Sequence, residues 1–166
     1  MQSVIESLTA ELAVLQSMGA LRLVEILAAV VCGSALGADR RVHGSVAGMR
    51  TCTLVCVGAV VYTQVGSVLV AEYGIGDPSR MAGQIVTGIG FLGAGAILRV
   101  GQGVSGLTSA AVIWFAGALG VLIGSSYPLT AVGLAFGVVV LLRGLEIVEN
   151  RLVPRPEPPD RAPPGP

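Results

Sequence analysis

The chain has 166 residues, 53% of them hydrophobic and only 12% charged, so a water-soluble fold would lack the polar surface to cover itself. Ten basic and ten acidic residues give a formal net charge of zero, and the long basic cluster is confined to a single loop, so nothing indicates the basic stripe that a nucleic-acid-binding protein needs. The composition therefore predicts an integral membrane protein that is surrounded by the lipid bilayer.

Residues 1–20 predict an amphipathic helix. Ser3 and Glu6 have the spacing of a capping box, and the apolar residues that follow at every third or fourth position share one face. We expect this helix either to lie along the membrane surface or to pack on the bundle as a lead-in helix. The segment has no basic start and no A-x-A pattern, so we expect no cleaved signal peptide.

The first membrane span is predicted over residues 21–38, which is just long enough to cross a hydrocarbon layer of ~30 Å. Glu25 lies near its start, one helical turn from Arg22. A carboxylate inside a membrane segment is a functional candidate. The alternative, which the terminal position favours, is a carboxylate that pairs with Arg22 at the membrane interface.

Residues 39–50 form a polar loop whose charges are mostly positive, with Arg40, Arg41 and Arg50 against Asp39. By the positive-inside rule this loop is cytoplasmic. The second span, residues 51–71, returns the chain to the other side. Residues 72–77 form the turn there, and they carry no excess of positive charge, as expected for an outward-facing loop.

Three further spans are predicted over residues 81–98, 107–125 and 129–142, the last extending to about residue 147. Arginines mark the side that we expect to be cytoplasmic, at Arg99, Arg143 and Arg151. The sequence therefore predicts an all-α, polytopic bundle of about five transmembrane helices within residues 21–150, with glycine-rich third and fourth helices, the N-terminus outside and the C-terminus inside. The proline-rich residues 154–166 predict a disordered tail.

Three cysteines, Cys32, Cys52 and Cys56, lie in apolar runs, where a thiol behaves as a small hydrophobic group. Cys52 and Cys56 are one helical turn apart, but no His or third Cys accompanies them on that face, so we do not expect a metal site there. We interpret all three as packing residues.

The third span has a glycine at almost every turn. On a helical wheel one face is bulky, and we expect it to meet lipid: Ile85, Ile89, Leu92 and Ala96. The two other faces are small or polar, and small residues let helix backbones approach closely in a membrane, so we expect this helix to be clamped between two neighbours. The predicted packing residues are Gly83, Gly88, Gly90, Gly93 and Gly95, with Gly120 and Gly124 of the fourth span.

Polar residues at the start of the third span have different explanations. Asp77 and Pro78 are typical of a helix start, since Asp caps the first turn and Pro is tolerated at the first helical position. Arg80 and Gln84 are one helical turn apart and we expect both to point into the bundle. Burying the Gln84 amide in the membrane costs free energy unless it forms a hydrogen bond with another helix. The predicted set of functional polar residues is Asp39, Arg40, Arg50, Asp77, Arg80 and Gln84.

The carboxylates raise two functional possibilities, aspartyl-protease catalysis and metal binding. Residues 74–77 match the G-x-G-D string of intramembrane aspartyl proteases, which need a second carboxylate within a few Å. Asp39 is one span away from Asp77, about 30 Å across the membrane, so this pair fails and we expect no catalysis. Asp39 and Asp77 are also the candidate metal ligands, but each has an arginine within one helical turn, which repels a cation. No cofactor is expected.

Three ordered blocks of the sequence carry a family resemblance. Residues 37–51 read GADRRVHGSVAGMRT, residues 77–95 read DPSRMAGQIVTGIGFLGAG, and residues 106–114 read GLTSAAVIW. They resemble the G-x-E/D-R and A-G-L-R-T block, the D-P-x-R…Q-I-V-x-G-I-G-F-L-G-A-G signature and the G-L-T-T-A-A-x-x-W segment of the MgtC/SapB family of bacterial inner-membrane proteins. Asp39 stands where Glu is commoner in the family, and Met49 where Leu is commoner.

The resemblance implies a non-enzymatic inner-membrane regulator, linked to adaptation to low magnesium, to membrane energetics or ion homeostasis, and to survival inside host phagocytes. It also implies membrane protein partners such as the F-type ATP synthase, while the small-residue faces allow a homo-oligomer. Many members have a soluble C-terminal domain, and we expect this chain to be a short form without it. A transporter or channel for magnesium or another divalent cation is the alternative function, and an intramembrane aspartyl protease is the third.

Overall fold

The structure is a computed structural model that describes residues 2, 5, 9, 19–42, 45, 47–74, 76–100 and 103–152. The predicted tail of residues 154–166 and most of the predicted amphipathic helix of residues 1–20 lie outside the described residues. The elements are α2 (Gly19–Val42), α3 (Met49–Tyr73), α4 (Pro78–Gly95), β1 (Leu98–Val100), β2 (Gly103–Ser105), α5 (Leu107–Gly124) and α6 (Pro128–Leu152).

The described chain is a helical membrane bundle, which confirms the predicted fold class. Helices α3, α5 and α6 are each long and apolar enough to cross a membrane, by length and composition. Between the predicted third and fourth spans, where the sequence predicts no strand, β1 and β2 form a short antiparallel hairpin. This hairpin pairs Leu98 with Ser105 and Val100 with Gly103, and it joins α4 to α5.

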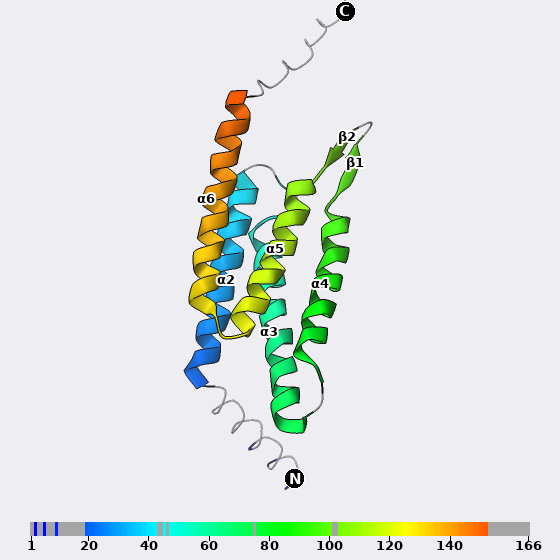
Figure 1. Ribbon diagram of the computed structural model, residues 1–166, viewed down its shortest axis with the longest axis vertical. Helices are drawn as coiled ribbons and strands as arrows, with labels where there is room; N and C mark the ends of the chain where they lie inside the picture. Colours follow the sequence, from blue (N-terminus) through cyan, green and yellow to red (C-terminus); the bar gives the residue numbers. More distant parts are fainter. Residues whose placement is uncertain are drawn as a thin grey trace, which may run out of the picture.

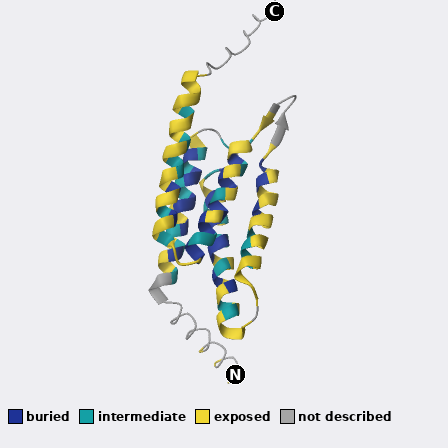
Figure 2. Ribbon diagram, viewed as in Figure 1, coloured by how far each residue is buried: buried dark blue, intermediate teal, exposed yellow. Residues whose placement is uncertain are grey.

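The five helices run alternately in opposite directions along one long axis (Figure 1). Helix α5 contacts all four of the others, and α2 also contacts α3 and α6. Buried residues therefore concentrate on α2, α3 and α5, whereas α4 and α6 are largely exposed at the edges of the bundle (Figure 2).

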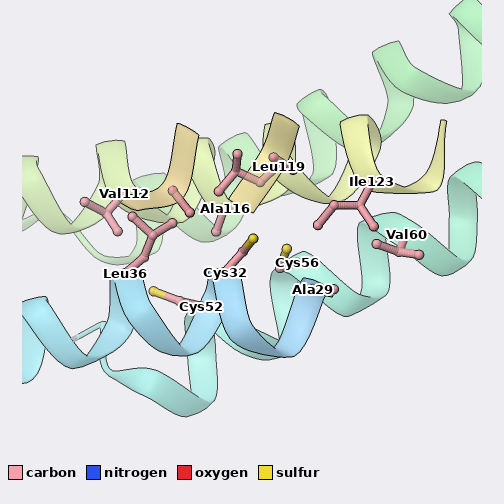
Figure 3. Packing of buried hydrophobic residues seen from close by; sticks show 12 residues of the cluster. Ala29, Cys32, Leu36, Cys52, Cys56, Val60, Val112, Ala116, Leu119 and Ile123 are labelled. Carbon is pink, nitrogen blue, oxygen red and sulfur yellow. The ribbon is translucent and has the colours of Figure 1, made fainter. Parts of the chain in front are cut away.

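The main core is a dry seam between α2, α3 and α5 (Figure 3). On α2 the seam follows a spacing of three and four residues through Ala29, Cys32 and Leu36, all at most 1% exposed. Cys52 and Cys56 of α3 lie in the same seam, and all three cysteines are buried and free. The thiols thus fill the core between helices, as the sequence predicts.

Glycines allow the closest helix approaches. A Cβ at Gly37 of α2 would lie 2.4 Å from the Cα of Met49, and one at Gly33 would lie 2.5 Å from the Cα of Thr53, so α2 and α3 pack backbone to backbone. A Cβ at Gly120 of α5 would lie 2.4 Å from the carbonyl oxygen of Cys56 on α3, and one at Gly124 would also meet α3. Gly120 and Gly124 therefore lie at a helix contact, where the sequence places them.

Helix α4 packs with part of the face that was expected to meet lipid. Ile89 and Ala96 are only 8% and 7% exposed and Ile85 is half-buried, whereas Leu92 is 49% exposed. A Cβ at Gly117 of α5 would lie 2.0 Å from Cδ1 of Ile89, so the glycine provides the space into which this side chain fits. A Cβ would meet nothing within 4 Å at four of the predicted packing glycines, Gly83, Gly88, Gly90 and Gly95. Only Gly93 of that group is buried, against Ala110.

The face prediction is wrong for Ile89 and Ala96, because a helical wheel gives the angular spacing of residues but not the shape of the neighbouring helix. The Ile89 side chain packs into the space that Gly117 leaves on the surface of α5. Helix α4 still contacts two helices, α3 and α5, but it does so with its bulky face. Of its small residues, Gly93 packs against Ala110 of α5, whereas Gly83, Gly88, Gly90 and Gly95 are exposed.

Candidate functional site

Two polar clusters occupy opposite ends of the buried face of α2. Asp39 and Glu25 are 4% and 7% exposed, and both continue the spacing of the core seam on that helix. They stand 14 positions apart, which is about 21 Å along a helix. Each carboxylate is bound by side chains from other parts of the bundle.

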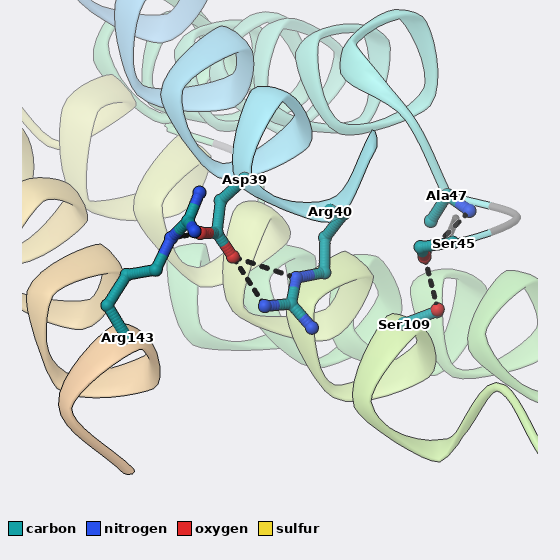
Figure 4. Close-up of polar contacts among 6 residues, drawn as sticks. All are labelled: Asp39, Arg40, Ser45, Ala47, Ser109 and Arg143. Atoms are coloured by element: carbon teal, nitrogen blue, oxygen red, sulfur yellow. Dashed lines mark hydrogen bonds and ion pairs between the residues drawn. The ribbon is translucent and has the colours of Figure 1, made fainter. Parts of the chain in front are cut away.

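The Asp39 cluster consists of Asp39, Arg40 and Arg143 (Figure 4). Arg143 of α6 donates from Nε to Oδ1 of Asp39 at 2.6 Å. Arg40 donates from Nε to Oδ2 at 3.0 Å and also from its terminal nitrogen. The carboxylate side chain is 2% exposed, that of Arg40 is 11% exposed and that of Arg143 is 45% exposed. The cluster therefore ties α6 to the end of α2.

Electrostatics keep Asp39 ionised. Burial alone would raise the pKa of this carboxyl group, but the hydrogen bonds and charges of Arg40 and Arg143 outweigh it and hold the pKa below its usual range. Asp39 follows the predicted span of residues 21–38, in the last turn of α2. A carboxylate neutralised by two guanidinium groups attracts a further cation poorly.

The chain between α2 and α3 is held to α5 beside this cluster (Figure 4). The hydroxyl groups of Ser45 and Ser109 share a hydrogen bond, and the backbone N–H of Ala47 donates to Ser45 Oγ at 3.3 Å. Arg41 and Arg50 are exposed on either side of this segment. Arg40 and Arg50 were both predicted as functional polar residues. Arg40 is half-buried and bound to Asp39, whereas Arg50 is exposed.

The Glu25 cluster consists of Glu25, Gln64 and Ser126. Gln64 of α3 is 7% exposed and donates from Nε2 to Oε2 of Glu25. Ser126, in the turn between α5 and α6, donates from Oγ to Oε1 at 3.1 Å. Ser126 has a φ of 70°, an unusual value for a residue other than glycine, and this contact ties its turn to α2.

The expected pair between Glu25 and Arg22 is not formed. Among the described residues no ion pair joins these two side chains, and Nη1 of Arg22 is buried without a hydrogen-bond partner. The interfacial interpretation of Glu25 is therefore wrong, since the carboxylate is buried and bound by two neutral donors from distant segments.

The remaining predicted polar residues lie on α4 or before it, and they are exposed: Asp77, Arg80 and Gln84. Asp77 caps α4 by accepting from the N–H of Ser79 at 2.8 Å, with Pro78 at the first helical position, which confirms the predicted helix start. Hydrogen bonding to Ser79 lowers the pKa of Asp77. Asp77 begins α4 and Asp39 ends α2, at opposite ends of the bundle, so the two carboxylates cannot share a proton (Figure 1).

Metal ligands do not gather in the described part of the chain, where no group of three or more His, Cys, Asp or Glu side chains is close enough to hold one ion. The sequence missed Gln64, Ser126 and Arg143 as partners of the buried carboxylates. Both carboxylates are thus bound to protein donors from other helices or turns.

A family model and the most similar curated proteins point to the same family. A model described as the MgtC family matches residues 26–151. The chain is 42% identical over 127 residues to a protein of Escherichia coli (strain K12) named "Putative magnesium transporter YhiD", covering 70% of this chain and 56% of that protein. It is 42% identical over 102 residues to "Protein MgtC" of Salmonella typhimurium (strain LT2), covering 61% and 42%.

A third relative is "Protein MgtC" of Brucella abortus (strain 2308), which is 43% identical over 120 residues, covering 70% of this chain and 49% of that protein. The chain thus spans about half the length of the curated relatives it matches. No solved structure matches the chain.

Proposed function

Because the chain belongs to the MgtC family, we propose that it is a non-enzymatic regulatory protein of the bacterial inner membrane. Its role is adaptation to low magnesium through an effect on membrane energetics or ion homeostasis, and with it intracellular survival. It crosses the membrane several times, with the Asp39 cluster at the cytoplasmic end. It acts by contact with another membrane protein, for which the family resemblance suggests the F-type ATP synthase.

The observation that carries this proposal is the double ion pair of Asp39 with Arg40 and Arg143. Two guanidinium groups occupy the carboxylate, so the cluster holds helices in one arrangement and leaves little charge for an incoming cation. Ser45, in the loop between α2 and α3, is bound in turn to Ser109 of α5. Residues that such contacts hold beside exposed arginines suit a docking surface, because ordered residues lose little conformational entropy on binding.

The contact surface includes Arg41 and Arg50, which are exposed beside this loop. Arg40 contributes to the fold instead, because its side chain is 11% exposed and bound to Asp39. Exposed arginines recognise carboxylates on a partner with good geometry. The partner should therefore present acidic groups near the membrane surface.

The test is site-specific photo-crosslinking in native membranes, with a photoreactive side chain at position 41 or 50. The matched control is position 73, because Tyr73 is 64% exposed at the opposite end of α3. We expect one shared crosslinked protein from positions 41 and 50, and none from position 73. No crosslink at either arginine position, or the same product from all three, would count against the proposal.

Transport of a divalent cation is the second candidate, and the Glu25 cluster favours it. Glu25 is a buried carboxylate whose hydrogen-bond donors, Gln64 and Ser126, are neutral. Carboxylate, amide and hydroxyl oxygens are ligands that magnesium accepts. One relative also carries a name that describes magnesium transport. The two candidates predict opposite results for magnesium movement across a membrane that contains only this protein.

A further inference from the structure

A cleft of about 560 Å³ lies between α3 and α4. Its lining is mostly apolar, and it includes Gly58 and Tyr62 from α3 with Gln84, Gly88 and Leu92 from α4. Tyr62 is 63% exposed and Leu92 is 49% exposed, so the cleft opens to the outside of the bundle. Nothing in the described chain covers it.

One wall of the cleft is α3, which has the length and composition of a membrane span. Helix α4 packs along α3 and α5, and both of those helices have the length and composition of membrane spans. Gln84 is the seventh residue of α4, about 9 Å along the helix from Pro78. When α4 runs through the bilayer beside α3 and α5, an amide this far along the helix meets lipid tails rather than water.

Two polar groups in this cleft have no protein partner. Within the described residues, neither the Gln84 amide nor the Tyr62 hydroxyl takes part in a hydrogen bond. An unpaired amide or hydroxyl costs free energy in hydrocarbon. A lipid tail has no donor or acceptor to offer, so a lipid in the cleft would leave both groups unpaired.

We propose that the occupant of the cleft is α4 of a second copy of this chain. An amide is both donor and acceptor, so Gln84 of one copy can pair with Gln84 of the other across a two-fold axis. Gly58 and Gly88 lack side chains, and a Cβ at either position would meet nothing within 4 Å, so the backbone of another helix can approach the mouth of the cleft closely. Close packing at small residues with a polar pair is how membrane helices associate. This dimer does not depend on the proposed regulatory function.

Subunit counting by single-molecule photobleaching, in liposomes over a range of protein-to-lipid ratios, measures the dimer directly. We expect Gln84→Leu to weaken dimerisation about three- to thirtyfold, the range for interhelical polar contacts in membranes. Gly88→Leu should weaken it too, because its side chain would enter the cleft. The matched control is Gly137→Leu on exposed α6, where a Cβ also meets nothing within 4 Å. This control should leave dimerisation unchanged.

Cysteine crosslinking in native membranes then locates the surface. Gln84→Cys should give a homodimer, whereas Val86→Cys should not, because position 86 is 43% exposed but points 200° away around the helix. A protein that is monomeric at every density would overturn the proposal. A dimer indifferent to Gln84→Leu and Gly88→Leu, or a crosslink from position 84 to a different protein, would overturn it as well.

Discussion

Arg143 donates from Nε to Oδ1 of Asp39 at 2.6 Å, across 104 residues of sequence. This contact joins the last helix of the bundle to the first described one, at the point where the polar loop begins. The same carboxylate binds Arg40 through its other oxygen. One aspartate thus ties α6 to the last turn of α2.

Removing the carboxylate should destabilise the bundle more than removing one arginine. We expect Asp39→Ala to cost about 3 kcal/mol of unfolding free energy, because it leaves buried guanidinium charge without a partner. Arg143→Ala should cost about 1 kcal/mol, since water screens a side chain that is 45% exposed. Denaturation in mixed micelles measures both, with the exposed Arg41→Ala as the neutral control. Equal losses for Asp39→Ala and Arg41→Ala would contradict the cluster.

Acid should weaken the bundle through the same residue. The pKa of Asp39 is lower in the folded chain than its unfolded value of about 3.9, so its stabilising contribution is complete above that pH. The contribution is lost as the pH falls from about 4 through the folded pKa. The midpoint of thermal unfolding should therefore drop in this window for the wild type, and less for Asp39→Asn. Asp77→Asn is the second control, because the pKa of Asp77 is lowered too. Identical pH profiles for wild type and Asp39→Asn would disprove this assignment.

Glu25 and Gln64 should be energetically coupled. Glu25→Ala leaves the buried Gln64 amide unpaired, whereas the double variant Glu25→Ala/Gln64→Leu removes both polar groups. A double-mutant cycle of unfolding free energies should give a coupling of about 0.5–2 kcal/mol. Additive single effects would mean that the contact contributes nothing to stability.

The packing of α4 can be tested by a compensating pair. Gly117→Ala places a Cβ 2.0 Å from Cδ1 of Ile89, and we expect a loss of about 1–3 kcal/mol from the overlap. Ile89→Val removes that methyl group, so the double variant should recover much of the loss. If α4 instead packed with its glycine faces inward, Ile89→Val would give no rescue. Gly133→Ala on α6 is the control, since its Cβ meets nothing within 4 Å.

Local signals made the helix boundaries predictable. The Asp77-Pro78 pair starts α4 because the cap and the proline act within one turn, and the hydrogen bond to Ser79 shows it. The predicted spans lie along the five helices for the same reason, since apolar runs end at arginines or glycines. These features need no knowledge of the neighbouring helices.

The hydrogen-bond partners of the buried carboxylates could not be predicted from neighbouring residues in the sequence. The sequence suggested Arg22 for Glu25 because it is one turn away, yet the partners come from Gln64 and Ser126, 39 and 101 residues further along. One signal was available, because Glu25, Ala29, Cys32, Leu36 and Asp39 alternate in steps of four and three. This spacing places both carboxylates on the buried seam of α2. Only the assembled bundle shows what binds them there.

Magnesium uptake into liposomes that contain only the purified protein tests the regulatory proposal most directly. A fluorescent magnesium indicator inside the liposomes reports uptake, and Glu25→Gln removes the one buried carboxylate that has neutral partners while keeping its shape. We expect no uptake above that of empty liposomes, for the wild type and the variant alike. Saturable uptake by the wild type that Glu25→Gln abolishes would contradict it and establish the chain as a transporter.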